Sequence, residues 1–117
     1  MKISKIVELL NAKVICCSDE CDKEVANACA SDMMSDVLAF VKDQAVLITG
    51  LNNPQVVRTA IMMDMVCIVY VRNKIPDAIS MALAKEKGIV LLSSEDRMFV
   101  ACGKLFNAGL DGGSLDL

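Results

Sequence analysis

The fold of this chain is decided by a stretch that reads Ala45-Val-Leu-Ile-Thr-Gly-Leu-Asn-Asn-Pro-Gln-Val-Val-Arg-Thr59. It begins with a short apolar run typical of a strand, passes through a polar turn, and continues in a helical pattern. Asn53 is a favourable helix N-cap, and Pro54 has the backbone angle preferred at the first helical position. The stretch therefore predicts a strand over residues 45–49 and a helix that begins after Asn53.

The same strand-turn-helix unit occurs twice more in the second half of the chain. Residues 65–71 form a nearly continuous apolar run, which is expected of a central strand covered by helices on both faces. The helix predicted after it, over residues 77–87, is ended by Gly88. A third strand is expected over residues 89–92, and the polar turn 93–96 supplies capping groups for a last helix.

Two helices are predicted before the repeats. Apolar residues recur at helical spacing over residues 4–11, where Ser4 is the expected cap. The segment 31–41 is expected to hold a short helix capped by Asp32 or Ser35. Both helices have one apolar face, so both are expected to cover a sheet.

Two further strands are predicted over residues 12–17 and 24–30. The turn between them is too short for a crossover, so we expect the sheet to be mixed at that end. Elsewhere strands alternate with helices, which gives parallel strands joined by right-handed crossovers. The predicted fold class is α/β, a three-layer α/β/α arrangement with a mostly parallel, partly mixed five-stranded sheet. A single domain is expected over residues 1–108, followed by a flexible tail over residues 109–117.

Composition excludes several classes of partner. The chain has 117 residues with 15 acidic and 12 basic side chains, and it contains no block of Lys or Arg that could follow a phosphate backbone. One Tyr and no Trp leave little on which bases could stack, so we expect no nucleic acid partner. The longest apolar run is far shorter than the roughly 20 residues of a bilayer span. The first residues lack the pattern of a secretory signal, and a cytoplasmic location is expected.

Six cysteines raise the question of metal or redox chemistry. Cys16, Cys17, Cys21 and Cys29 lie close together in the sequence, but the chain has no Cys-x-x-Cys pair and no His, so the common zinc spacings are missing. Adjacent Cys16 and Cys17 are expected to point to opposite faces of a strand. The favoured interpretation is structural thiols, with no bound cofactor or metal. Cys17 with Cys21 is the exception to test.

The turns after the three repeated strands are the best candidates for a ligand site, because ligands of open α/β sheets bind beyond the carboxyl ends of the strands. Backbone N–H groups at a helix start can bind a small anion there. The alternative is that these residues only form turns and cap helices. The candidate ligand-binding residues are Thr49, Gly50, Asn52, Asn53, Arg72, Ser93 and Ser94.

An enzymatic role is not expected. Without His, a general base near neutral pH would need a carboxylate or cysteine with a strongly shifted pKa. Asp32 and Asp36 lie four residues apart, but capping and solvation explain both. The chain also has eight Met residues, which suit an adaptable core or interface. The pairs 33–34 and 62–63 are the expected place for a homodimer contact.

Four segments resemble the DRTGG domain family. They are Lys2-Ile-Ser-Lys-Ile-Val-Glu-Leu-Leu-Asn-Ala-Lys-Val14, Ser31-Asp-Met-Met-Ser-Asp-Val-Leu38, Leu47-Ile-Thr-Gly50 before a helix, and Ala84-Lys-Glu-Lys-Gly-Ile-Val90 before Ser93-Ser94. The resemblance covers residues 1 to about 108. Such domains resemble the N-terminal domain of HPr kinase, accompany CBS-domain pyrophosphatases and phosphotransacetylases, and occur as short stand-alone proteins, which this chain resembles. The resemblance implies a non-catalytic, dimeric regulatory module.

The chain departs from the family at the motif that gives it its name. Leu51-Asn52-Asn53 stands where the family has Asp-Arg after the first strand-end glycine, and Val71-Arg72-Asn73 stands where it has Thr-Gly-Gly. Both departures fall on strand-end turns, and Arg72 is the candidate to restore the positive charge.

Three functions follow, in falling order. The first is a regulatory module that senses a nucleotide or other phosphorylated metabolite at the strand ends. The second is an interaction subunit that binds a redox enzyme or kinase. The third is a metal or iron-sulfur carrier that uses the four clustered cysteines.

Overall fold

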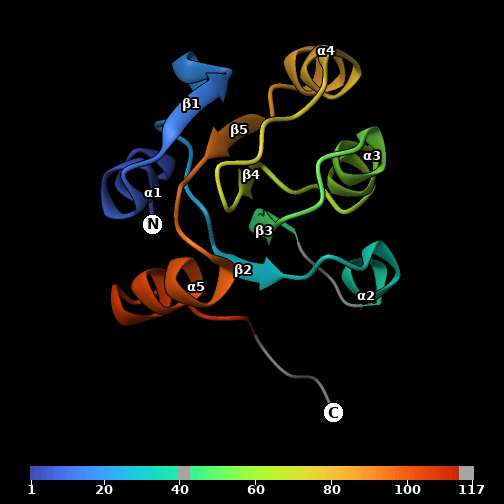
Figure 1. Ribbon diagram of the computed structural model, residues 1–117. Helices are drawn as coiled ribbons and strands as arrows, with labels where there is room; N and C mark the ends of the chain where they lie inside the picture. Colours follow the sequence, from blue (N-terminus) through green and yellow to red (C-terminus); the bar gives the residue numbers. More distant parts are fainter. Residues whose placement is uncertain (40–42, 114–117) are drawn as a thin grey trace.

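The structure is a computed structural model that describes residues 1–39 and 43–113. A five-stranded sheet lies between two layers of helices (Figure 1), in the strand order β1-β5-β4-β3-β2. Strands β2 to β5 run parallel, and β1 pairs antiparallel with β5. The predicted three-layer α/β/α class and the mixed sheet are therefore confirmed. The strands are β1 (Lys13–Cys16), β2 (Asn27–Ala30), β3 (Ala45–Thr49), β4 (Cys67–Tyr70) and β5 (Val90–Ser93).

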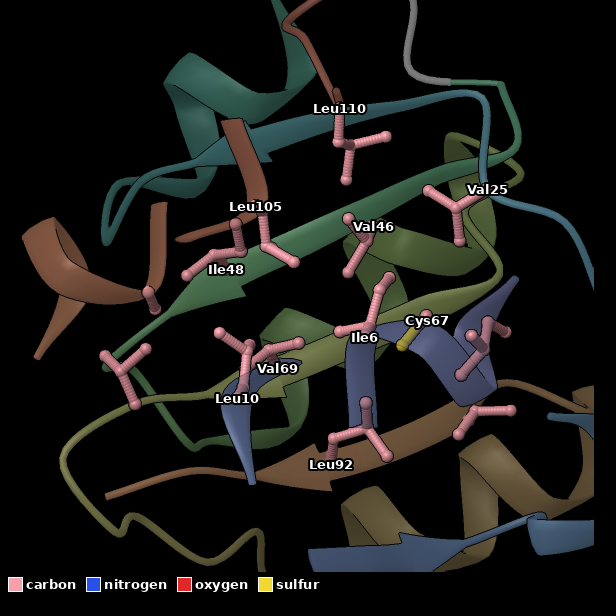
Figure 2. Packing of buried hydrophobic residues seen from close by; sticks show 14 residues of the cluster. Ile6, Leu10, Val25, Val46, Ile48, Cys67, Val69, Leu92, Leu105 and Leu110 are labelled. Atoms are coloured by element: carbon pink, nitrogen blue, oxygen red, sulfur yellow. The ribbon is translucent and has the colours of Figure 1, made fainter. Parts of the chain in front are cut away.

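The helices are distributed unequally over the two faces. α1 (Ile3–Leu10) and α5 (Met98–Asn107) cover one face, where their apolar residues pack on β3, β4 and β5 (Figure 2). α2 (Met34–Leu38), α3 (Pro54–Met62) and α4 (Ala78–Lys87) cover the other. The three central strands are buried along their whole length, as the apolar run at 65–71 predicts for β4. None of the described helices has the length and apolar character needed to span a bilayer.

The expected neighbourhood of the first two strands is wrong. β1 and β2 lie at opposite edges of the sheet, and the mixed end arises because β1 pairs with β5. The segment between the two strands is held under the start of α1, where Ile3 and Ser4 N–H donate to the carbonyls of Lys23 and Cys21 at 3.0 and 2.9 Å. These bonds attach the segment to α1, and the two strands pair with β5 and β3 in place of each other.

Two of the predicted helix caps are wrong. Ser4 lies inside α1, and Lys2 at the N-cap makes no side-chain capping bond, because backbone carbonyls of residues 21–23 accept the first N–H groups. Met33 stands at the N-cap of α2, also without a side-chain bond, so neither Asp32 nor Ser35 caps that helix. Asn53 is confirmed as the cap of α3, and Gly88 ends α4 in a left-handed conformation.

The chain makes contacts with the core and the sheet after residue 108, where the flexible tail is expected to begin. Leu110 is 5% exposed and belongs to the core beside α5 (Figure 2). The carbonyl of Asp111 accepts the Ala28 N–H at 2.8 Å, so the chain after α5 adds a contact to the open edge of β2. Residues 114–117 of the predicted tail lie outside the described residues, as do residues 40 and 41 of the segment 31–41 in which a short helix is expected.

Candidate functional site

The carboxyl ends of the parallel strands bring the predicted site residues to one edge of the sheet. Thr49 at the end of β3 is in register with Tyr70 of β4, and Tyr70 is in register with Ser93 of β5. The turns behind them are joined by the Val71 N–H, which donates to the Thr49 carbonyl at 2.9 Å. The seven predicted residues therefore belong to three adjacent turns.

The first turn, after β3, is closed by a carboxylate of the chain itself. Gly50 N–H and the Thr49 hydroxyl both donate to Oδ1 of Asp32, at 2.7 and 3.1 Å. The Leu51 N–H in turn donates to the Thr49 hydroxyl at 3.1 Å. Asp32 thus occupies the anion-binding position that the sequence assigned to a ligand. Its place just after β2, the parallel neighbour of β3, is the signal that could have identified this role.

The two asparagines of this turn are also engaged in the fold. The Asn52 amide donates to the Ile75 carbonyl at 2.9 Å and so ties the first turn to the second. The Asn53 side chain accepts the Gln55 N–H at 3.1 Å at the start of α3. Both side chains are exposed. The Asn52 side chain links two turns, and the Asn53 side chain caps α3.

The two serines of the third turn are buried. The Ser93 hydroxyl donates to the Lys74 carbonyl at 2.8 Å, and the Ser94 hydroxyl donates to the Leu10 carbonyl at 3.1 Å. The Ser94 hydroxyl also accepts the Asp96 N–H at 3.2 Å. The serines therefore join the turn to its neighbours. The capping expected of residues 93–96 is wrong, because Arg97 is the N-cap of α5 and makes no side-chain bond.

Arg72, in the second turn, is the predicted site residue that projects a charge into solvent. Arg72 and Asn73 both have positive φ, at 56° and 60°, and Lys74 N–H donates to the Val71 carbonyl at 3.2 Å. Two consecutive left-handed residues define a type I′ turn, which ordinarily uses Asn-Gly or Gly-Gly. The chain thus keeps, without glycine, a conformation that costs an ordinary side chain about 1 kcal/mol or more.

The side chain of Arg72 lies across the first turn. A Cβ placed on Gly50 would come within 2.5 Å of an Nη atom of Arg72, so the missing side chain at Gly50 makes room for the guanidinium group. The backbone of Arg72 reaches the third turn, where its N–H donates to the Asp96 carbonyl at 2.9 Å. Arg72 therefore contacts both of the neighbouring turns.

Charges of both signs surround this group. Lys74, two residues after Arg72, is exposed, and so is Arg97, which follows the Asp96 whose carbonyl accepts the Arg72 N–H. The Asp96 side chain forms an ion pair with Lys104 at 2.8 Å. On the other side, the hydrogen bond from the Ser80 N–H lowers the pKa of Asp77, the cap of α4, and the nearby charge of Arg58 lowers it further.

Tyr70 is a feature that the sequence analysis missed. Its hydroxyl is fully buried at the end of β4 and has no hydrogen-bond partner among the described residues. Burial raises the pKa of this phenol, and the negative charge of Asp77 raises it further. A neutral, unpaired hydroxyl therefore lies in the core on the side of the sheet that α3 and α4 cover.

The four clustered cysteines do not assemble into one site. Cys29 lies on β2 and Cys16 on β1, at opposite edges of the sheet. No group of three or more potential ligands among His, Cys, Asp and Glu is gathered for a metal ion in the described part of the chain. The expectation that Cys16 and Cys17 point apart is also wrong. Their Sγ atoms are 3.3 Å from each other, because Cys17 follows β1 with φ 63°.

A surface hollow lies at the opposite end of the strands. It has a volume of about 540 Å³ and is formed by the start of α1 and the chain after α5, at the amino ends of the parallel strands. Its lining includes Lys2, Lys5, Glu8 and Gly109. The hollow therefore contains none of the seven predicted site residues.

Comparisons with known proteins agree with the fold. The crystal structure of the CBS and DRTGG domains of the regulatory region of Clostridium perfringens pyrophosphatase, complexed with the activator diadenosine tetraphosphate, aligns with a TM-score of 0.71 and 15% sequence identity. The alignment covers 89% of this chain and 45% of that one, so the chain spans less than half of that regulatory region. No significant match is found among curated protein sequences. The sequence pattern of the DRTGG domain matches residues 5–106, and the chain therefore belongs to the DRTGG domain family.

Proposed function

We propose that this domain is a non-catalytic regulatory module that binds a nucleotide or another phosphorylated metabolite at the carboxyl edge of its sheet. The observation that carries the proposal is Arg72, an exposed cation held in a left-handed turn with its guanidinium group against Gly50. Strained backbone that persists at a ligand edge is a reason to infer function. Arginine is suited to phosphate because its planar group donates two parallel hydrogen bonds.

The same geometry narrows the part of the edge that a ligand would contact. Asp32 already accepts the Gly50 N–H, and the Ser93 and Ser94 hydroxyls are bonded inside the fold. The groups that remain turned to solvent are the Arg72 guanidinium and the nearby cations Lys74 and Arg97. The start of α5, which has no side-chain cap, follows directly after Arg97. The phosphate is therefore proposed to lie between the second and third turns.

The pyrophosphatase structure adds support for the class of ligand. That protein is described with diadenosine tetraphosphate as its activator, which is a nucleotide rich in phosphate. At 15% identity the likeness concerns the fold, so the ligand class is part of our proposal for this chain.

Thermal-shift measurements with ATP, AMP, diadenosine tetraphosphate and pyrophosphate test the proposal. A ligand at about a hundred times its Kd stabilises the folded state by about 2.7 kcal/mol, which raises the Tm by several degrees. We expect this rise for at least one probe, its loss in Arg72→Ala, and its retention in Lys85→Ala, a matched loss of charge in the last turn of α4. A chain that responds to none of the four probes would contradict the ligand part of the proposal.

We also propose that the module is a homodimer that pairs through α2 and α3. Met33, at the N-cap of α2, is 61% exposed, and Met62, the last residue of α3, is 67% exposed; the two helices pack together. Light scattering should give twice the chain mass for the native protein and the chain mass for Met62→Lys. The matched control is Phe106→Lys, on the opposite face of the sheet. A native protein that elutes as a monomer would contradict the dimer.

A second candidate function is the interaction subunit of a redox or kinase system. The observation that favours it is the outer side of α5, where Phe99 is 88% exposed and Phe106 is 72% exposed. Large aromatic side chains are enriched at protein interfaces. Co-purification with a partner enzyme that is lost in Phe99→Ser, and that does not depend on added nucleotide, would favour this candidate.

The proposed location is the cytoplasm, where thiols such as buried Cys67 stay reduced.

A further inference from the structure

Two adjacent thiols contact each other where β1 ends. Cys16 is the last residue of the strand, and Cys17 follows it in a left-handed conformation with φ 63°. This backbone turn brings the second side chain to the same side as the first, and the two Sγ atoms are 3.3 Å apart. A left-handed conformation is uncommon for a residue other than glycine, so this juxtaposition is a specific feature of the fold.

The pair lies against α4 and is open to small molecules. Cys16 Sγ is 3.8 Å from the Met81 carbonyl oxygen, and Cys17 Sγ is 3.7 Å from that of Ala84. Both thiols are only partly buried, and both line a hollow of about 460 Å³ that also includes Lys85. A small disulfide can therefore approach the sulfur atoms from solvent.

The neighbouring backbone has room to adjust. The pairing of β1 with β5 changes register between Val14 and Cys16, so the end of the strand departs from regular pairing where the thiols lie. Edge irregularities of this kind tolerate local movement better than the middle of a ladder does. The closing of a bond between the sulfur atoms would therefore leave the central strands in place.

We propose that Cys16 and Cys17 are a reversible thiol–disulfide site that exchanges with a low-molecular-weight disulfide. One thiol loses its proton and attacks a sulfur of the small disulfide, which releases one small thiol and leaves a mixed disulfide. The second thiol then loses its proton and attacks the protein sulfur of that mixed disulfide, which releases the second small thiol. The two cysteines lose two electrons in total, and one small disulfide becomes two small thiols.

The bond is expected to be easy to reverse. Adjacent Cα atoms are about 3.8 Å apart, which is shorter than the roughly 4.4–6.8 Å usual across a disulfide. A bond closed over this short span is strained, and strained disulfides are the labile or regulatory ones. Oxidation also removes the two S–H groups that face the carbonyls of Met81 and Ala84, so it would weaken the contact between β1 and α4.

The exchange should become faster at higher pH. Partial burial and, to a smaller extent, the hydrogen bond with Cys16 together raise the pKa of Cys17 to about 12. Because the thiolate is the attacking form, little of Cys17 is reactive at pH 7 and more becomes reactive as the pH rises.

Incubation with glutathione disulfide, followed by alkylation in denaturant and mass spectrometry, tests the site. The expected product carries two fewer alkyl groups than the reduced protein, retains no glutathione, and returns to the reduced form with dithiothreitol. Trypsin should release residues 14–23, in which Cys21 is alkylated and the other two cysteines are joined. This peptide gives the location of the bond without any variant.

Two variants and one control complete the test. Cys16→Ser and Cys17→Ser should stop at the mixed disulfide, because each lacks the second thiol. Cys21→Ser, a thiol close in sequence, should form the bond as the native chain does. The proposal is overturned if the native chain keeps all its thiols open to alkylation, if it stops at the mixed disulfide, or if Cys21→Ser abolishes the product.

Discussion

The turns after β3 and β4 lie side by side at the same edge of the sheet, but they differ in what their polar groups contact. Those of the first turn are hydrogen-bonded within the chain, and the charged group of the second faces solvent. In the first, the Gly50 N–H and the Thr49 hydroxyl are bonded to Asp32, so the turn is closed by the chain's own carboxylate. In the second, Arg72 and Asn73 hold positive φ without glycine, and the Arg72 side chain projects from the turn. The first turn resembles a binding loop, but its hydrogen-bond donors already have an acceptor. The second turn has a strained backbone and exposes a positive charge.

The contrast extends into the strands themselves. Thr49 and Tyr70 are register partners at the ends of β3 and β4, and both carry a hydroxyl. The Thr49 hydroxyl donates to Asp32 and accepts from Leu51, whereas the buried Tyr70 hydroxyl has no partner among the described residues. The hydroxyl of Thr49 at the end of β3 is therefore expected to contribute more to the free energy of unfolding than the hydroxyl of Tyr70 at the end of β4.

The largest effect is expected from Asp32→Ala. The substitution leaves the Gly50 N–H and the Thr49 hydroxyl without their charged acceptor, and a hydrogen bond to a charged group contributes about 1.5–3 kcal/mol. We expect a loss of about 2 kcal/mol in urea denaturation. Asp36→Ala, an exposed carboxylate on α2, is the matched control and should cost less than about 0.5 kcal/mol. Equal losses in the two variants would show that Asp32 does not close the turn.

The next largest effect on stability is expected from removing the hydroxyl of Thr49 or that of Tyr70, and the two changes should have opposite signs. Thr49→Val should cost about 1 kcal/mol, because it leaves the Leu51 N–H without its acceptor. Tyr70→Phe should stabilise the fold by up to about 1 kcal/mol, because it removes a buried hydroxyl that makes no hydrogen bond. Urea midpoints of the two variants check the opposite signs. If Tyr70→Phe is as destabilising as Thr49→Val, the Tyr70 hydroxyl has a partner.

A smaller effect is expected from glycine in the second turn. Arg72→Gly removes the cost of a left-handed side chain, about 1 kcal/mol, and part of that gain is lost to the greater freedom of the unfolded chain. The variant should be slightly more stable than the native chain while it loses the response to anionic ligands. Lys74→Gly is the control, because its φ is not positive, and it should be less stable than the native chain. If both variants are less stable than the native chain, the backbone at Arg72 is not strained.

The smallest effect concerns pH. The first turn leads to a helix capped by Asn53, which does not titrate, and the second leads to a helix capped by Asp77. The hydrogen bond from the Ser80 N–H holds the pKa of Asp77 below its unfolded value. This contribution to stability is therefore fully present above the unfolded pKa and is lost as the pH falls through the folded one. Asp77→Asn should reduce the difference between urea midpoints at pH 7 and pH 3, and an unchanged difference would contradict this cause.

Much of the fold could be predicted from the sequence because its signals are local. Apolar runs marked the three central strands, and Asn53 with Pro54 marked the start of α3. The edge strands could not be placed in this way. β1 pairs with β5, and backbone carbonyls of residues 21–23 bond to the start of α1. Both are contacts between backbone groups, which carry no signature in the sequence.

The sequence predicted that the seven candidate residues lie at one edge of the sheet, but not what each side chain contacts. The seven residues do meet at one edge, since parallel strands end together. Which of them face solvent depended on contacts between distant residues, such as Asp32 with Gly50 and Ser94 with Leu10. The meeting of Cys16 and Cys17 was missed because alternation in a strand holds only up to its last residue, and Cys17 lies one residue beyond it.

The most direct test of the central claim is an amide NMR titration of the native chain with ATP. We predict saturable shifts at Arg72, Asn73 and the first residues of α5, with a smaller change at Gly50, whose amide stays bonded to Asp32. Arg72→Ala should lose these shifts. Shifts that cluster around Lys2 and Gly109 at the opposite end of the strands, or no shifts at saturating nucleotide, would contradict the claim that the Arg72 turn is the ligand site.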